Sequence, residues 1–229
     1  IYNGLYGRAQ FVPFRKGDRE GNRWMDDEPL FCEWTNRAVT FLSQDPQARW
    51  QGHRFFFRDG LTYNIHARGV LLKCKLLRNC VFDAGASFLA TAANNIAPEY
   101  LLCLLNSHVI SFFIKKFRNN TWHELNDIRQ VPIVVPTAVQ HRRLCDAATL
   151  AMAAKRHEFE GTSPANELVS RVRELGEALC SAAPVYLQPS AQGHLLETPA
   201  DCLEVIEKSV NWEAEKLYGV EGQGPFDEF

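Results

Sequence analysis

Three basic and aromatic segments carry the residue types that bind phosphate groups and nucleobases: residues 14–24, 54–64 and 115–121. An arginine fork fits phosphate oxygens or a guanine edge, and a tryptophan packs on a sugar or a base. The segments therefore predict a nucleic-acid surface. Its candidate DNA-binding residues are Arg15, Lys16, Arg19, Arg23, Trp24, Arg54, Arg58, Thr62, Tyr63, Lys115, Lys116, Arg118 and Asn120.

The three segments are expected to contribute differently. In the first, a polar, glycine-containing loop on a rigid sheet is a common place for binding residues, and we expect its cations to hold the phosphate backbone while Trp24 reaches a groove. In the second, a regular strand would place Arg54, Phe56 and Arg58 on one face, with Thr62 and Tyr63 as further groove contacts.

Two of the segments also have a purely structural interpretation. Arg54 and Arg58 could pair with neighbouring acids instead of a ligand. The cations of the third segment stand at the predicted end of a helix, where positive charge is favourable without any ligand. Both interpretations stay open at the level of sequence.

Motifs for catalysis are missing from the sequence. There is no GxGxxG or phosphate-binding glycine loop, and no histidine spacing typical of a zinc site. The run Gly85-Ala86-Ser87-Phe88 lacks the second glycine of a GxSxG nucleophile elbow. The acids Asp26, Asp27 and Glu28 are adjacent, so on an extended segment they point to opposite faces. We therefore expect no catalytic centre, cofactor or metal in this chain.

The charge distribution indicates which half of the chain can bind an acidic partner, and the cysteine content indicates the redox compartment. Residues 1–136 hold 17 Lys and Arg against 12 Asp and Glu, a net charge of +5, whereas residues 137–229 hold 8 against 15, or −7. Only the first part can approach an acidic partner such as DNA. Seven cysteines without a CxxC pair suit a reducing cytoplasm better than a disulfide framework or a zinc site.

The elements that must position these residues change in character near residue 97. Before it, short apolar runs bounded by turn residues predict strands of a mostly antiparallel sheet, with a short helix at 35–43. After it, Pro98 and helical apolar spacing predict one long buried helix, 97–117, which polar residues mark as a core helix and not a membrane span. The predicted strands are 9–14, 29–34, 53–57, 69–74 and 80–83.

Beyond residue 117 the sequence predicts a helical turn at 126–130, capped by Asn126 or Asp127, and a proline-flanked edge strand or extended tail at 131–136. Three helices follow, at 137–160, 163–182 and 199–218, with Ser163 as an N-cap and Gly161 and Gly219 as stops. The fold class is therefore α+β: a twisted, mainly antiparallel sheet on a long buried helix, then a helical hairpin and a further helix. We expect two domains, 1–136 and 137–229.

Several segments, in this order and spacing, resemble the C-terminal target-recognition region of N6-adenine DNA methyltransferases. That group includes Type IIG restriction enzymes and the large methylases of BREX phage-exclusion systems. The resemblance spans about residues 9–136. It is carried by Pro13-Phe14-Arg15-Lys16-Gly17, Arg23-Trp24, Phe57-Arg58-Asp59-Gly60-Leu61-Thr62, Cys80-Val81-Phe82-Asp83-Ala84-Gly85, Tyr100-Leu101-Leu102-Cys103-Leu104-Leu105-Asn106-Ser107, Lys115-Lys116 and Asn126-Asp127-Ile128-Arg129-Gln130-Val131-Pro132-Ile133.

The resemblance implies a module that binds double-stranded DNA and reads its sequence for a catalytic domain in the N-terminal part of the same parent chain. That domain would use S-adenosylmethionine and an Asn-Pro-Pro-Tyr-type motif on a flipped adenine. Neither feature is present here, and we interpret the start at Ile1 as the start of a fragment. The chain departs from the family pattern at Gly17-Asp18-Arg19-Glu20 and Met25-Asp26-Asp27, so its loop is expected to contact DNA differently.

Two other functions remain open. The chain could be a protein-docking module of a defence complex, with its basic loops serving an acidic partner. It could also be a small nuclease that binds magnesium through Asp26, Asp27 and Glu28.

Overall fold

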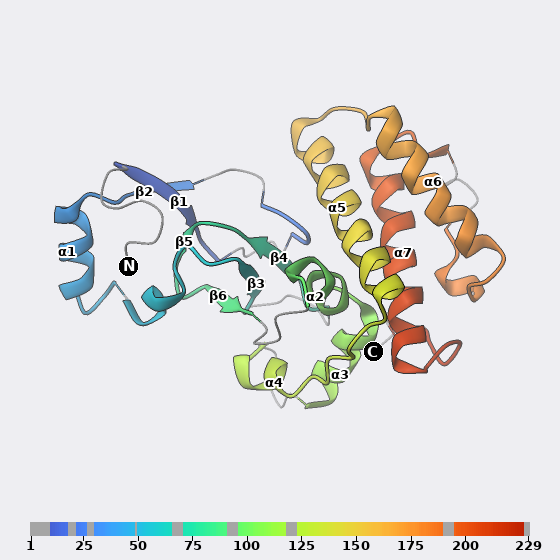
Figure 1. Cartoon of the computed structure of the whole chain (residues 1–229), viewed down its shortest axis with the longest axis horizontal. Coiled ribbons are helices and arrows are strands. Elements are labelled where there is room, and N and C mark those ends of the chain that lie inside the picture. The colour runs from blue at the N-terminus through green and yellow to red at the C-terminus, as the bar shows by residue number, and fades with distance from the viewer. Residues whose placement is uncertain are drawn as a thin grey trace.

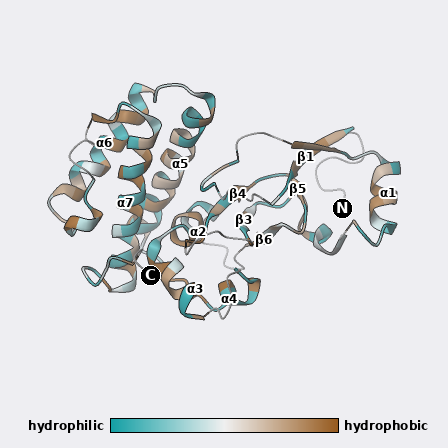
Figure 2. Ribbon diagram, turned by 180° about the vertical axis from the view of Figure 1, so that it is seen from behind, coloured by the Kyte–Doolittle hydropathy of each residue, from teal (hydrophilic) through white to brown (hydrophobic). Residues whose placement is uncertain are grey.

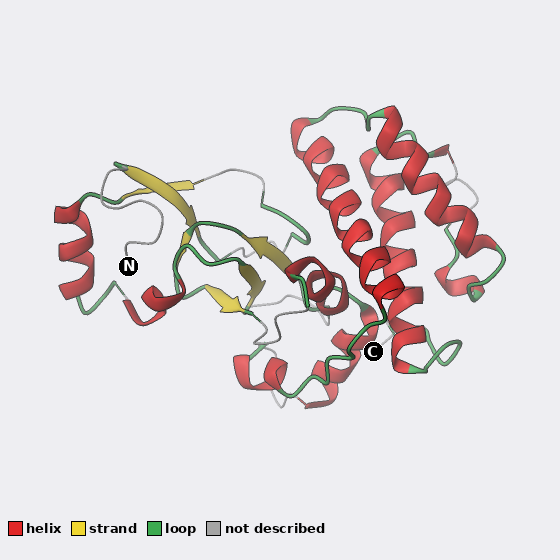
Figure 3. Ribbon diagram, in the orientation of Figure 1, coloured by secondary structure: helices red, strands yellow, loops and turns green. Residues whose placement is uncertain are grey.

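Short strands fill the N-terminal part of the chain and helices the remainder, so the fold is α+β (Figures 1 and 3). The computed structural model describes residues 10–17, 22–26, 30–48, 50–65, 71–90, 96–117, 123–189 and 195–226. Instead of the single predicted sheet, these residues form two three-stranded sheets.

The first sheet has the strand order β2-β1-β5, formed by Leu30–Glu33, Phe11–Arg15 and Val81–Phe82. Strand β1 runs antiparallel to β2 and parallel to β5. The predicted short helix is confirmed as α1, Asn36–Gln44, with the Thr35 hydroxyl accepting from the backbone N–H of Ala38. A small core joins this sheet to α1 and to the 3₁₀ helix η1, Trp50–Phe55; its buried members are Val12, Trp34, Val39, Phe56 and Val81.

The second sheet is antiparallel, with the order β4-β3-β6, formed by Cys74–Leu77, Gly60–Asn64 and Ala86–Leu89. The predicted strand at 53–57 is wrong, because residues 50–55 form η1 and Phe57 has a positive φ of 62° that turns the chain. Strands β3 and β6 were not predicted. A bridge from Trp24 to Lys75 extends the β4 edge.

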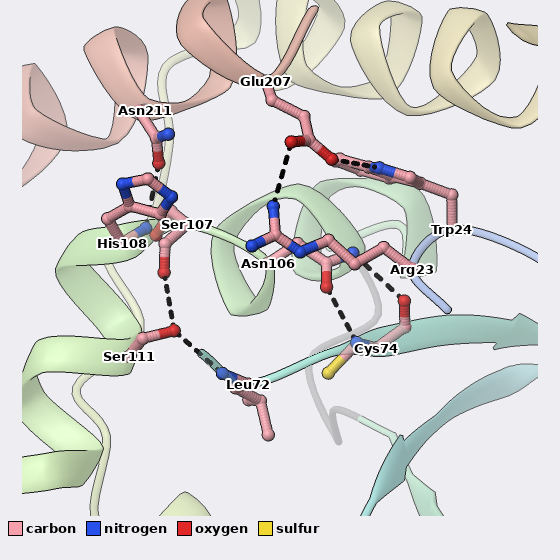
Figure 4. Close-up of polar contacts among 10 residues, drawn as sticks. All are labelled: Arg23, Trp24, Leu72, Cys74, Asn106, Ser107, His108, Ser111, Glu207 and Asn211. Atoms are coloured by element: carbon pink, nitrogen blue, oxygen red, sulfur yellow. Dashed lines mark hydrogen bonds and ion pairs between the residues drawn. The ribbon is translucent and has the colours of Figure 1, made fainter. Parts of the chain in front are cut away.

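The predicted helix 97–117 is broken. It forms α2, Pro98–Leu105, and α3, His108–Phe117, bent by 69° at Asn106 and Ser107. Asn106, 2% exposed, uses both ends of its amide on the peptide of Cys74: Oδ1 accepts from Cys74 N at 2.7 Å, and Nδ2 donates to Cys74 O at 3.1 Å. The side chain that ends α2 therefore fastens it to β4 (Figure 4).

Three further hydrogen bonds hold the bend (Figure 4). Ser111 Oγ donates to Ser107 O at 3.2 Å and accepts from Leu72 N at 3.0 Å, and His108 N donates to Asn211 Oδ1 at 2.9 Å. The bend is thus tied both to the strand region and to the last helix of the chain. Because these partners are remote in sequence, apolar periodicity alone did not reveal the break.

The C-terminal helices follow their local signals closely. They are α4, Leu125–Arg129, α5, Ala138–Glu160, α6, Asn166–Cys180, the 3₁₀ helix η2, Val185–Leu187, and α7, Pro199–Tyr218. Thr137 and Thr198 form capping boxes, and Gly161 and Gly219 end their helices in the left-handed region, as predicted.

Two predicted caps are wrong, and one of two alternatives for residues 131–136 is decided. Helix α6 begins after Ala165 rather than Ser163, and α4 begins after Glu124, neither with a side-chain capping bond. Residues 131–136 are an extended segment without strand pairing, which is the tail alternative that the two prolines allowed. Helix α7 packs against both α5 and α6 (Figure 1).

One large core joins the strands to the helices. It includes Leu61 of β3, Tyr100 of α2, Leu144 of α5 and Val210 of α7. Figure 2 shows the matching alternation of hydrophobic and hydrophilic residues along α5, α6 and α7. The core therefore crosses residue 136, where the sequence predicted a domain boundary.

Within the described ranges, no single helix is long and apolar enough to cross a membrane. The bent pair α2 and α3 has sufficient length and apolar composition only when the two helices are taken together.

Replacing Ser209 by alanine is expected to raise the free energy of unfolding by about 1 kcal/mol. The Ser209 hydroxyl is buried in α7, and no described residue forms a hydrogen bond with it. Alanine removes this desolvated group and is the better helix former. Urea denaturation measures the change, with Ser170→Ala on the exposed side of α6 as the matched control. If Ser209→Ala gains no more than the control, the buried hydroxyl is not a cost.

Candidate nucleic-acid interface

Two arginines flank an aromatic ring at the end of η1. The guanidinium carbons of Arg54 and Arg58 lie 4.7 and 5.9 Å from the centroid of the Phe55 ring. Both arginines are exposed, and no described acid lies within salt-bridge distance of either one. Cation–π contact orients such a fork while leaving its charge available to an anion.

The Phe55 ring continues into a stack that we call the aromatic ladder, consisting of Phe55, Phe88 and Phe82. Phe55 and Phe88 stack at 5.1 Å between centroids, and Phe88 and Phe82 at 5.6 Å. All three rings are half-buried. The ladder therefore connects η1 to a strand of each sheet, β6 and β5, and gives the two arginines a rigid base.

The backbone that carries the ladder requires a glycine. A Cβ at Gly60 would lie 2.5 Å from the Phe88 ring, too close for any side chain. The left-handed turn at Phe57 is held by its N–H, which donates to Cys80 O at 2.9 Å. Arg58 and Gly60 therefore occupy fixed positions beside the ladder.

Lys16 lies near the other end of the ladder. It follows Arg15, the residue of β1 that pairs with Phe82. Asp83 Oδ1 accepts from the backbone N–H groups of Gly17, Gly85 and Ala86 at 3.1, 2.9 and 3.0 Å. This turn anchors the start of the basic loop and leaves Lys16 exposed. The structure thus places Lys16, Arg54 and Arg58 around one set of rings.

Arg15 is held by an acid. Its Nε lies 3.4 Å from Asp26 Oδ2, and the buried ammonium group of Lys75 contacts Asp26 Oδ1. Arg15 is thus part of a partly buried ion cluster instead of extending into solvent as expected. Asp26 is neutralised by two cations, which does not suit a magnesium ligand. Asp27 and Glu28 lie outside the described residues.

The prediction that Trp24 is exposed is wrong, since the side chain is 1% exposed. Its indole N–H donates to Glu207 Oε1 at 3.0 Å, and Arg23 Nη1 pairs with Glu207 Oε2 at 3.1 Å (Figure 4). The polar neighbours of Trp24 in sequence suggested a surface loop, but α7 covers it. Arg23 and Trp24 therefore connect the strand region to α7 and do not project as a free loop.

Thr62 and Tyr63 are also buried, 6% and 3% exposed, because β3 is the central strand of its sheet. Burial raises the pKa of Tyr63. Their side chains are not accessible to a DNA groove, so their prediction as groove contacts is wrong.

The third basic segment lies apart from the ladder. Lys115 and Lys116 are in the last turn of α3, and Lys116 Nζ lies 5.1 Å from the Phe112 centroid. Figure 1 shows α3 and η1 at separate places, with the second sheet between them. The three remaining candidates, Arg19, Arg118 and Asn120, lie outside the described residues.

Metal-ligating side chains do not cluster in the described ranges. No three His, Cys, Asp or Glu residues there are placed to hold a metal ion. All seven cysteines are free thiols. Burial raises the pKa of Cys80 to about 11 and that of Cys74 further, which keeps both thiols protonated and weakly nucleophilic near neutral pH.

The residues that sequence reasoning missed are Phe82 and Phe88. They come from separate short strands. Phe82 belongs to a segment that carries the resemblance, but only the aromatic content of these runs could have pointed to either residue as part of the site.

No protein-family model matches the chain, and no curated protein sequence matches it significantly.

Proposed function

We propose that the chain binds double-stranded DNA, as the target-recognition module of an N6-adenine DNA methyltransferase of the restriction-modification or phage-defence kind. The observation that carries the DNA-binding part is the pair Arg54 and Arg58, exposed on the Phe55 ring with no acidic partner among the described residues. The methyltransferase part rests on the sequence resemblance over residues 9–136.

In this proposal, Lys16, Arg54 and Arg58 contact phosphate oxygens and fix the orientation of the module on the duplex. The aromatic ladder pre-positions the two arginine forks, so fewer rotamers are lost on binding. The S-adenosylmethionine chemistry belongs to a catalytic domain of the same parent chain in a reducing cytoplasm. The acidic helices, with a net charge of −7 over residues 137–229, mainly brace that domain.

A salt series tests DNA binding directly. Three phosphate contacts predict a slope of about −2.7 for log affinity against log salt concentration on a short duplex. Fluorescence anisotropy from 50 to 300 mM salt, or roughly that range, measures the slope. A mixed-sequence duplex and a panel of methylation sites then separate non-specific from specific binding. Absence of binding at low salt would contradict the proposal.

Docking of a protein partner is the second candidate. Phe11 and Phe31 are 60% and 58% exposed, and they share the outer face of the β1–β2 pair with Pro13. Apolar docking depends weakly on salt, so a flat salt series with a captured protein partner would favour it. The nuclease alternative loses its basis in Asp26, which is paired with Arg15 and Lys75.

A further inference from the structure

A second basic site lies where the strand region meets the helices. A pocket of about 370 Å³ opens between the segment at Arg23 and Trp24, the approach to β4, and helices α5 and α7. Its charged lining residues are Arg23, Lys73, Lys155 and Glu207. The pocket is separate from the aromatic ladder, since none of its lining residues belongs to η1, β5 or β6.

Positive charge exceeds negative charge in this pocket. Glu207 is already held from two sides, by Arg23 at 3.1 Å and by the Trp24 indole at 3.0 Å. Lys155 pairs with Glu158 and lies 4.9 Å from the Phe159 ring. The three lining cations are therefore opposed by one lining carboxylate.

Lys73 provides the unbalanced charge. No described acid lies within salt-bridge distance of its ammonium group. Its backbone is fixed: Lys73 N donates to Asn64 Oδ1 at 3.2 Å, and Asn64 N donates to Lys73 O at 3.3 Å. The lysine is therefore held at the pocket wall, and none of the acids that the structure describes pairs with it.

The lining cations are also poorly hydrated. The side chains of Arg23 and Lys155 are only 12% and 14% exposed. In such surroundings the attraction of a cation for an oxyanion is screened less than on an open surface. Arg23 can share its fork between Glu207 and an incoming anion, since a guanidinium carries five donors.

We infer that this pocket binds a phosphate group, with Lys73 and Arg23 as its main donors and Glu207 as the group that opposes binding. The phosphate can belong to a DNA backbone or to a free phosphorylated small molecule. Only the DNA source rests on the proposed function, because binding of a small phosphate probe is independent of any duplex.

Calorimetric titration of the whole chain with pyrophosphate tests the pocket. Fluorescence anisotropy with a DNA duplex of about 20 base pairs tests whether DNA supplies the phosphate. Lys73→Gln is expected to weaken binding of the effective probe about tenfold, one lost charge-assisted contact. Glu207→Gln is expected to strengthen it about threefold, since it removes the opposing charge and keeps an acceptor for Trp24. Arg173→Gln, an exposed charge loss on α6, is the matched control and should change neither.

The outcomes separate the possible sources. If Lys73→Gln weakens the binding of pyrophosphate alone, the ligand is a free phosphorylated molecule. If it weakens the binding of the duplex alone, the ligand is a phosphate of the DNA backbone. A third outcome is that both substitutions change pyrophosphate binding while the unsubstituted chain binds no duplex. That result supports this pocket and overturns the proposed function. Should Lys73→Gln and Glu207→Gln behave like Arg173→Gln with both probes, the inference is wrong.

Discussion

Asn106→Leu is expected to lower the free energy of unfolding by about 3 kcal/mol, the largest stability change we predict. Asn106 is buried, and its amide satisfies both the N–H and the C=O of Cys74. Leucine has a similar volume, so the cavity left behind is small. The cost comes mainly from the Cys74 N–H, which loses its partner inside the core at roughly 1–3 kcal/mol. Cys74 O loses one of its two bonds and keeps the one from the Trp24 N–H at 3.0 Å.

Urea denaturation followed by circular dichroism measures this change through the midpoint at constant slope. Asn126→Leu is the control, because Asn126 is exposed on α4 and its side chain is expected to matter by no more than about 0.5 kcal/mol. Equal stability of the two variants would show that the bond pair at Cys74 does not hold α2 on β4.

The same asparagine shows why the break between α2 and α3 could not be predicted. The apolar spacing of Tyr100 to Phe117 continues through the polar residues 106–108, so the pattern is that of one helix. The bend is fixed by Cys74, Leu72 and Asn211, which lie far away in the sequence. Periodicity reports the buried face of a helix and contains no information about such partners.

Elements with local signals were predicted well. The stops at Gly161 and Gly219 depend only on neighbouring residues, and α5 and α7 end there as predicted. Helices α1 and α5 begin within one residue of their predicted starts. The strands were less accurate because pairing decides them. Gly60–Asn64 is the central strand of the second sheet, yet this segment begins and ends with turn-forming residues and was not predicted as a strand.

The candidate site also has a part that the sequence predicts and a part that depends on tertiary contacts. Residue type was enough to select Lys16, Arg54 and Arg58. It could not separate them from Arg15 and Arg23, whose acidic partners are Asp26 and Glu207. The second partner lies on α7, in a region that the sequence assigned to a different domain. Whether a cation pairs with an acid is therefore a property of tertiary packing. Among the described cations of the first two segments, Lys16, Arg54 and Arg58 are the exposed ones.

The double variant Arg54→Gln with Arg58→Gln is expected to weaken duplex binding roughly 30-fold at low salt, about 2 kcal/mol. It is also expected to reduce the salt slope by about 1.8, since two phosphate contacts are lost. Both side chains are exposed and lie on a ring that remains, so the fold is not expected to change. Anisotropy titrations at four or more salt concentrations, about 50–300 mM, measure both quantities.

A matched double variant, Arg37→Gln with Arg173→Gln, removes the same net charge from exposed positions on α1 and α6. Both proteins then have an equal long-range field, so a difference between them reports local contact with the duplex. The salt slope is the more informative quantity, because it reports the number of phosphate contacts and is insensitive to a small loss of folded protein. An unchanged slope in the ladder variant, or an equal drop in the matched one, would place the DNA surface elsewhere on the chain.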